Sequence, residues 1–531
     1  MEPQQYYVIG SGPSGIAAAS SLLSSGRNVT LLDAGLKLEP EREAMGLRMA
    51  AADPQEWSHE DVSASRAALD GRGEIAKKLH LGSDYLYRAL PESTPMDYGN
   101  LEVRSSYAMG GLSNVWGAAL LPYLQKDVED WPITVSDLEQ AHAAVLSMLP
   151  VAGRRDDIVQ LFPLQVKNLD DPGQGSQIRR LLSDLERSRN QLAQNGLTFG
   201  TARLAVQFSG ESELASCNYC GHCLHGCPRD LIYSTRHSLE QLVAGGKLTY
   251  IRDTVVSRIV ESSRGVEIQV SGPRGLRRFN GARVFLGAGV FNSTALLLRS
   301  LDWYDRSVDV ADSQYYLFPL LQMLASPDVS HERMHTLAQL FLEITRESIS
   351  PYLVHLQVYG YNDILNDVLG RKFGRLWKYL PRNTLLGRLL IVQGYLHSEH
   401  SGRIKATLRT RGENGTLELE GILNPDTVNR VLRVIRYMRG ISRELRAIPL
   451  GSLLKIMQPG RGYHSGGSFP MAKNPREGQT DVLGRPAGWS RTHVVDATVF
   501  PSIPATTITQ TIMANAYRIA QQATQLDLKE G

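Results

Sequence analysis

A glycine-rich turn near the N-terminus is the feature that most constrains how this chain can fold. The apolar run Tyr6-Tyr7-Val8-Ile9 predicts a strand, and Gly10-x-Gly12-x-x-Gly15 follows it directly. The Ala- and Leu-rich segment from Ile16 to Leu23 predicts a helix after the turn. Such glycines allow a tight turn and let the backbone approach a pyrophosphate, which then lies at the positive end of the helix. The pattern predicts a dinucleotide-binding unit whose turn contributes Gly10, Gly12, Pro13, Ser14 and Gly15.

An acidic residue stands where this unit needs one. Asp33 ends the second predicted strand, Val29 to Leu32, and lies 18 residues beyond Gly15. A carboxylate near this spacing hydrogen-bonds a ribose hydroxyl of the nucleotide. The motif by itself leaves FAD and NAD open.

Composition limits the other function classes. The chain has 531 residues, of which 42% are hydrophobic and 21% charged, and this length favours two structural domains. Its 57 Lys and Arg nearly balance 54 Asp and Glu, so the whole-chain charge gives no reason to invoke nucleic acid or an anionic membrane. The sequence shows no secretory signal and no transmembrane segment, and a cytoplasmic location is expected.

Three further segments resemble the glucose-methanol-choline (GMC) oxidoreductases. The loop Gly110-Gly111-Leu112-Ser113-Asn114-Val115-Trp116-Gly117 is similar to the glycine-rich flavin loop of that family. Leu286 to Ser293 is similar to its second flavin segment, and the block from His464 to Ala520 is similar to its C-terminal signature. The segments occur in the family's order, with the glycine turn first.

This resemblance implies a fold and a domain arrangement. The expected fold is α/β, with a Rossmann-like FAD-binding domain of GMC type and an inserted α+β substrate domain built on an antiparallel sheet. Strand-like runs at 353–359 and 390–396 support the inserted domain, and in the first run His355 and Gln357 share one face. The FAD-binding domain is expected at 1–125, 200–300 and 456–531, with the cysteine-rich segment inside it; the substrate domain and connecting helices are expected at 126–199 and 301–455.

The resemblance also implies the cofactor and its contacts. FAD is expected to be noncovalent, because Val115 stands near the position at which some family members carry a flavin-linking histidine. The residues that the resemblance assigns to the cofactor, beyond the first turn and Asp33, are Gly110, Gly111, Ser113, Asn114, Val115, Trp116, Gly117, Val256, Ala288, Gly289, Asp496, Ala497, Thr507 and Ile508.

The catalytic residues follow from the same resemblance. His464 falls where the family places the histidine that accepts the hydroxyl proton while hydride leaves for flavin N5. Imidazole titrates near neutrality and suits this role. Thr507 occupies the second catalytic position, usually His or Asn, and a threonine hydroxyl cannot act as a base near pH 7. Either Thr507 only orients the substrate, or a side chain from the substrate domain takes part, with His397 and Asn362 as candidates.

All four cysteines lie in one short segment. Cys217-x-x-Cys220-x-x-Cys223-x-x-x-Cys227-Pro228 has the spacing of the bacterial ferredoxin run. The segment predicts a [3Fe-4S] or [4Fe-4S] cluster; zinc with His222 and His225, or a metal-free thiol or disulfide segment, remain alternatives. A cluster would relay flavin electrons to an acceptor, as in some GMC dehydrogenases.

The sequence therefore predicts an FAD-dependent dehydrogenase that oxidises an alcohol of a sugar, polyol or glycosylated metabolite. Its expected partners are this small-molecule alcohol, which is carbohydrate-related, and an electron-acceptor protein. The alternatives are an oxygen-using alcohol oxidase, a non-redox lyase similar to the hydroxynitrile lyases of the family, and an assembly subunit with a vestigial flavin.

Overall fold

The computed structural model describes residues 5–66, 78–273, 275–410 and 415–530. Segments from the beginning, the middle and the end of the chain build one parallel sheet. Its strand order is β20-β9-β1-β2-β5. β1 (Gln5–Ile9) lies at its centre and pairs in parallel with β2 (Asn28–Leu32) on one side and β9 (Arg283–Leu286) on the other. β5 (Thr249–Ile251) and β20 (Thr492–Val494) form the edges. This sheet confirms the α/β class and the predicted strand–turn–helix–strand unit.

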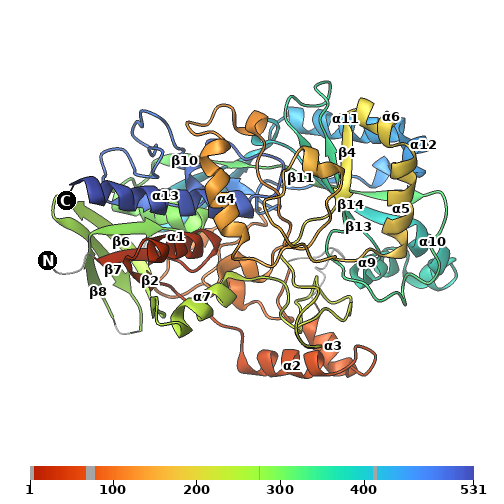
Figure 1. The fold of residues 1–531 in the computed structure, drawn as a ribbon, viewed down its shortest axis with the longest axis horizontal. Coiled ribbons are helices and arrows are strands. Elements are labelled where there is room, and N and C mark those ends of the chain that lie inside the picture. Colours follow the sequence, from red (N-terminus) through yellow and green to blue (C-terminus); the bar gives the residue numbers. More distant parts are fainter. Residues whose placement is uncertain (1–4, 67–77, 274, 411–414, 531) are drawn as a thin grey trace.

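Helices from the two ends of the chain lie together on this sheet. α1 (Pro13–Ser24) and α13 (Thr509–Glu530) run side by side in Figure 1, the first in red and the second in dark blue. Ile16 and Leu22 of α1 belong to the same apolar cluster as Ile519 of α13. Apolar faces of helices are stable on a sheet because both surfaces lose contact with water. The C-terminal helix thereby ends up beside the N-terminal glycine turn.

The other face of the parallel sheet is covered by a second layer. α8 (Val290–Ser300) follows β9 directly and packs with Leu296 and Leu297 into an apolar cluster that includes Leu32 and Val284 of the sheet. A three-stranded antiparallel sheet joins this layer, formed by β6 (Val255–Ser262), β7 (Gly265–Ser271) and β8 (Arg277–Gly281). Helices on parallel strands of this kind are the usual nucleotide-binding architecture.

A second, larger sheet forms the other half of the molecule. Its order is β17-β11-β14-β13-β12-β4, and β18 (Lys455–Ile456) also pairs with β11. All its pairings are antiparallel, as predicted for the substrate domain. The strands are β4 (Leu197–Thr201), β11 (Tyr315–Gln322), β12 (Leu340–Ile344), β13 (Val354–Tyr359), β14 (Leu389–Tyr395) and β17 (Ala447–Pro449). The predicted domain limit between 199 and 200 falls inside β4, all five of whose residues pair with β12.

Helices cover one side of this sheet. α5 (Ser176–Arg187) contributes Ile178 and Leu181, and α11 (Asp426–Gly440) contributes Val434 and Met438, to a cluster with the strands. α6 (Arg189–Gln194) and α12 (Ser442–Leu445) flank them. Short helices α9 (Asp363–Phe373) and α10 (Arg382–Arg388) connect β13 to β14.

A third set of strands joins the two halves. β19 (Ser465–Gly466) pairs with β10 (Ser307–Asp312), followed by β15 (Arg403–Arg409), β16 (Thr416–Ile422) and β3 (Met96–Asp97). The remaining α-helices are α2 (Pro40–Ala51), α3 (His59–Ser65), α4 (Glu139–Leu146) and α7 (Thr235–Ala244). Within the described part of the chain, no helix combines the length and the apolar character needed to cross a membrane.

Candidate active site

A cavity of about 530 Å³ extends from the carboxyl ends of β1 and β9 to the large antiparallel sheet. In open α/β sheets, ligands bind outside the carboxyl ends of the strands. Most residues predicted to bind the cofactor line this cavity: Gly10, Gly12, Pro13, Ser14, Asp33, Gly111, Ser113, Val115, Trp116, Gly117, Val256, Ala288, Gly289, Asp496, Ala497, Thr507 and Ile508. His464 lines it as well. Segments that are far apart in the sequence therefore meet at one site.

Three predicted cofactor residues support the site from behind. Gly15, Gly110 and Asn114 are absent from the cavity wall. An added Cβ on Gly15 would lie 1.9 Å from the Gly10 carbonyl oxygen, so its role is close packing of the helix on the turn. The Gly110 N–H donates to Ser11 Oγ at 2.8 Å. Asn114 donates to the carbonyls of Met109 and Gly111, and thereby shapes the loop.

The glycine turn leaves room for a phosphate group. A Cβ on Gly12 would meet no atom within 4 Å, and Gly12 is the N-cap of α1 without any side-chain cap. The first N–H groups of a helix without a cap are free to donate, and the helix dipole adds positive potential there. The turn therefore fits the pyrophosphate of a dinucleotide.

Asp33 is buried beside this turn. Its carboxylate accepts hydrogen bonds from the hydroxyls of Ser11 and, at 3.2 Å, Tyr250. Burial raises the pKa of Asp33 to about 6, against the lowering effect of these hydrogen bonds. A carboxylate in the cavity wall can also accept from a ribose hydroxyl, as the sequence predicted.

Asp496 has its oxygens occupied by the protein. It accepts from the Gly289 N–H at 2.9 Å, from Ser293 Oγ at 2.5 Å and from the Thr498 N–H at 3.0 Å. These bonds join the strand-to-helix turn after β9 to the C-terminal block. Asp496 lies in the cavity wall, and its side chain fixes the second flavin segment in place.

His464 lies where the nucleotide half and the substrate sheet meet. It directly precedes β19, and its ring stacks on Tyr395 of β14 with the ring centroids 4.8 Å apart. Its Nδ1 atom is buried without a hydrogen-bond partner among the described residues, and its side chain lines the cavity. Burial, with a smaller contribution from His355, lowers the pKa of His464 to about 3. The imidazole is therefore neutral at physiological pH and has an acceptor nitrogen, but it is a weaker base than the titration near neutrality that the sequence led us to expect.

Thr507 lies in the cavity wall, but its hydroxyl is engaged. It accepts from the Leu121 N–H at 2.8 Å and donates to the Leu121 carbonyl at 3.4 Å. The other two candidates for the second catalytic role lie outside the cavity wall. His397 stacks on Tyr352 and contacts the Asp127 carbonyl, and Asn362 caps α9.

The substrate sheet instead presents tyrosines and amides that the sequence reading missed. Tyr315, Gln357, Tyr359, Gln393 and Tyr395 all line the cavity. They come from three adjacent strands, β11, β13 and β14. The alternation in 353–359 places Gln357 and Tyr359 on one face, but which strands lie beside them depends on the tertiary pairing.

One chain of hydrogen bonds orients these groups. Tyr359 donates to Gln357 Oε1 at 2.9 Å, and Gln357 Nε2 lies 3.1 Å from His355 Nε2. His355 Nδ1 lies 2.7 Å from Glu343 Oε1, and both of these side chains are fully buried. With Nδ1–H donating to the carboxylate, Nε2 is the acceptor that the Gln357 amide requires. The Gln357 amide plane is thus fixed, with one N–H left unused by this chain.

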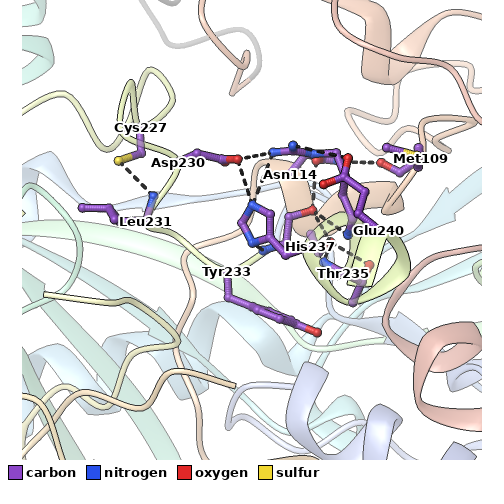
Figure 2. A network of polar contacts seen from close by, with 12 residues as sticks. Met109, Asn114, Cys227, Asp230, Leu231, Tyr233, Thr235, His237 and Glu240 are labelled. Carbon is purple, nitrogen blue, oxygen red and sulfur yellow. Dashed lines mark hydrogen bonds and ion pairs between the residues drawn. The ribbon is translucent and has the colours of Figure 1, made fainter. Parts of the chain in front are cut away.

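The cysteine segment is attached to the flavin loop by a polar network. Asp230 accepts from Arg236 at 2.7 Å and lies 2.8 Å from His237 Nε2. Figure 2 shows Asp230 beside His237. Ser234 donates to Asn114 Oδ1 at 3.0 Å, and the Leu231 N–H lies 3.5 Å from Cys227 Sγ. Leu224, between Cys223 and Cys227, reaches the cavity wall. The segment therefore lies directly behind the loop at 110–117.

The four thiols are free and close enough to affect one another. Burial and the neighbouring thiols raise the pKa of Cys217 to about 11, that of Cys220 to about 12, and that of Cys227 far above its usual range. Over the described ranges, no group of three or more His, Cys, Asp and Glu side chains is arranged to hold a metal ion. The predicted iron–sulfur cluster and the zinc alternative find no support in this arrangement.

Comparisons with known proteins agree with the observed fold. Residues 424–516 match the family model described as GMC oxidoreductase. A pyridoxine 4-oxidase from Mesorbium loti has the same fold, with a TM-score of 0.61 at 14% identity over 98% of this chain and 99% of that chain. A formate oxidase has a TM-score of 0.59 at 13% identity over the full length of both chains. A second formate oxidase structure, from Aspergillus oryzae RIB40 and concerned with FAD modification, has a TM-score of 0.59 at 14% identity and covers 100% of both chains.

No curated protein sequence matches the chain. The family match confirms the resemblance to the GMC oxidoreductases, and the solved structures confirm the fold over the whole length. Together with the glycine turn and Asp33, the family match supports FAD as the cofactor of the cavity.

We expect Asp33 to make the affinity for FAD depend on pH. Burial raises the pKa of Asp33 to about 6, so its carboxylate, the expected acceptor for a ribose hydroxyl, becomes protonated as the pH falls below that value. We expect the dissociation constant of FAD to rise by up to about tenfold per pH unit between pH 6 and 5. Fluorescence titration of the apoprotein measures this constant. Asp33→Asn should bind FAD more weakly and without this pH dependence; a wild-type constant that is flat from pH 7 to 5 would contradict the assignment.

Proposed function

We propose that this GMC-type flavin oxidoreductase oxidises the alcohol carbon of a small polyhydroxylated substrate, of the sugar or polyol class, to a carbonyl. The observation that carries the proposal is the position of His464, whose side chain lines the same cavity as the dinucleotide turn. Bound FAD would be noncovalent and would supply the acceptor for the carbinol hydride.

His464 performs the proton chemistry in this proposal. Its neutral ring accepts the hydroxyl proton at Nε2 and later releases it to solvent or to a second acceptor. Stacking on Tyr395 holds the plane of the imidazole, so that Nε2 keeps one direction in the cavity. Thr507 maintains the wall through its two bonds to Leu121 and takes no proton.

The composition of the cavity wall opposite the dinucleotide turn favours a polyhydroxylated substrate. Three tyrosines and two glutamines face the cavity there, and a wall of aromatic faces beside amide donors suits a ligand with apolar ring faces and several hydroxyls. The free N–H of Gln357 is the donor that we assign to a substrate oxygen. His355 and Glu343 are positioning residues, because they act through Gln357.

The first test concerns His464. Anaerobic addition of candidate sugars, polyols and aromatic alcohols should bleach the visible absorption of the oxidised flavin, and His464→Ala should slow this at least about 100-fold while retaining FAD. Because the pKa of His464 lies well below 6.5, the acid limb of kcat/KM should also lie below pH 6.5. The proposal fails if no alcohol bleaches the flavin or if His464→Ala reacts like wild type. Cleavage of a substrate with an unchanged flavin spectrum would identify a lyase. Oxygen uptake at the same rate as substrate turnover would identify an oxidase.

The second test concerns Gln357 and its support. Gln357→Leu should raise KM roughly tenfold, since it removes one hydrogen bond to the substrate. Glu343→Gln should have a similar effect, because its amide can donate to His355 Nδ1 and reverse the direction of the chain. The double variant serves as the control: it should be no worse than Gln357→Leu alone. Additive losses, or a change in kcat with KM unchanged, would show that Glu343 does not act through Gln357.

The iron–sulfur cluster is a separate proposal that rests on the sequence spacing of the cysteines. What supports it is that the cysteine segment adjoins the flavin loop, and that the Tyr219 and Leu231 N–H groups point at Cys217 and Cys227 sulfurs at 3.4 and 3.5 Å. Amide donors to sulfur tune the potential of such clusters. The reaction at His464 does not require it.

Measuring iron and acid-labile sulfide in anaerobically purified protein tests whether the cysteine segment binds a cluster. If a cluster is bound, both should be present in stoichiometric amounts, with a paramagnetic signal in one oxidation state, and Cys220→Ser should lose iron but keep FAD. His237→Gln, which changes the same network without removing a thiol, should keep both. Protein without iron would show that the flavin electrons leave by another route, and the cluster would be rejected.

A further inference from the structure

The connection between β13 and β14 is one of the stretches of the chain with a marked excess of positive charge. Residues 368–398 contain six Lys or Arg and no Asp or Glu, although the whole chain is nearly balanced. Those six are Arg371, Lys372, Arg375, Lys378, Arg382 and Arg388. The two carboxylates that precede them in α9, Asp363 and Asp367, both lie against Arg66, at 2.7 and 4.0 Å. The segment is therefore strongly cationic.

Large apolar side chains are exposed between these cations. Phe373, Leu376 and Tyr379 are 37, 67 and 86% exposed. They occupy the end of α9, the 3-10 turn Gly374–Lys378 and the residue after it. Bulky apolar groups are normally covered, and an exposed set next to cations indicates a surface for interaction.

The segment is nevertheless anchored. Trp377 is buried against Val329, Leu386 and Leu389, and its ring packs in parallel with that of Phe373 at 5.8 Å. The outward position of Leu376 and Tyr379 is thus set by an inward neighbour on the same turn. Because Trp377 is buried, the backbone of this short helical turn is held in place, and its exposed side chains point outward in a defined direction.

A neighbouring loop adds to the apolar surface. Met323 and Leu324, which follow β11, are 44 and 53% exposed. The loop is joined to the end of α10, since the Ser326 N–H donates to the Gly387 carbonyl at 2.8 Å and Arg388 Nε to the Gln322 carbonyl at 2.7 Å. Helices α9 and α10 lie toward the end of the molecule's long axis opposite the two termini (Figure 1).

Arg388 is engaged with the Gln322 carbonyl, but three of the other cations have no carboxylate partner in the part of the chain that the structure describes. Among the residues that the structure describes, no carboxylate lies within ion-pairing distance of Arg375, Lys378 or Arg382. Lys and Arg with interspersed Leu, Phe and Tyr match a lipid surface, where the charges meet anionic headgroups and the apolar groups enter the interface. A protein partner that was only acidic would use the cations and leave Leu376 and Tyr379 unaccounted for.

We propose that residues 371–388, together with Met323 and Leu324, dock this protein peripherally on a bilayer that carries anionic lipids. The charges attract the protein to the headgroups, and Phe373, Leu376 and Tyr379 enter the interface. The docking surface is distinct from the cavity, so the proposal is independent of the reaction.

Sedimentation with vesicles tests the proposal on the full chain with its cofactor. The protein should sediment with vesicles that contain phosphatidylglycerol, remain in solution with pure phosphatidylcholine, and lose most of its binding in 0.5 M salt, where the Debye length is only about 4 Å. The triple variant Arg375→Ala, Lys378→Ala, Arg382→Ala should bind roughly 100-fold more weakly, because each cation near an anionic surface contributes about fivefold.

Two further variants make the result specific. Arg436→Ala, Arg439→Ala, Arg443→Ala removes three charges from α11 and its continuation, and should bind like wild type. Leu376→Ser with Tyr379→Ser should weaken binding while leaving its salt dependence in place. All the variants should melt at the wild-type temperature, since the substituted side chains are on the surface.

Three results would overturn the proposal. The first is wild-type protein that binds neither kind of vesicle. The second is equal loss of binding in the two triple variants, which would show a non-specific effect of net charge. The third is failure to bind vesicles together with binding to polyglutamate-coated beads that the Arg375 triple variant loses, which would show a site for an acidic protein.

Discussion

The close approach of backbone at three glycines is the constraint on which the rest of this structure depends. A Cβ on Gly15 would overlap the Gly10 carbonyl, and a Cβ on Gly10 would lie 2.6 Å from the Gly287 carbonyl. Gly10 also has a φ of +93°, which side-chain-bearing residues rarely adopt. Only glycine at positions 10 and 15 lets α1 begin directly after β1 with the turn after β9 packed against the same backbone. The cavity exists because these backbones meet without side chains between them.

Polar bonds across long sequence distances then fix the cavity wall. Asp496 joins the C-terminal block to Gly289, and Thr507 joins it to Leu121. Both side chains have most of their hydrogen-bonding capacity occupied by the protein. Burying a polar group costs free energy unless the group is hydrogen-bonded. Few other side chains could therefore replace Asp496 or Thr507, even though their hydrogen bonds are to the protein. Their positions in the family motif reflect the need to hold the cavity wall together.

The residues of the cavity differ in how far the sequence could predict them, and the difference has a physical reason. The glycine turn was predictable because it depends on a local pattern that only a few backbone geometries can satisfy. His464 was assigned from the family resemblance, and the structure places it in the cavity wall. The wall formed by Gln357 and Tyr359 could be predicted only as one face of a strand. That Tyr315, Gln393 and Tyr395 stand beside them depends on the order β11-β14-β13, which no local pattern encodes. The whole-chain charge likewise concealed the cationic segment at 371–388, because a balanced total does not show how charge is distributed along the chain.

The sequence by itself determined the α/β nucleotide-binding unit, the antiparallel character of the inserted domain, and the pairing of a dinucleotide turn with a distant histidine. Periodicity, glycine positions and family motifs are local properties, and the folded chain retains them. Only the tertiary structure decided that the Thr507 hydroxyl is engaged, that Glu343 and His355 orient Gln357, and that the cysteine segment lies behind the flavin loop. Apart from the contact between His355 and Gln357, these contacts join residues 12 to 386 positions apart, and they are set by how the sheets and helices pack.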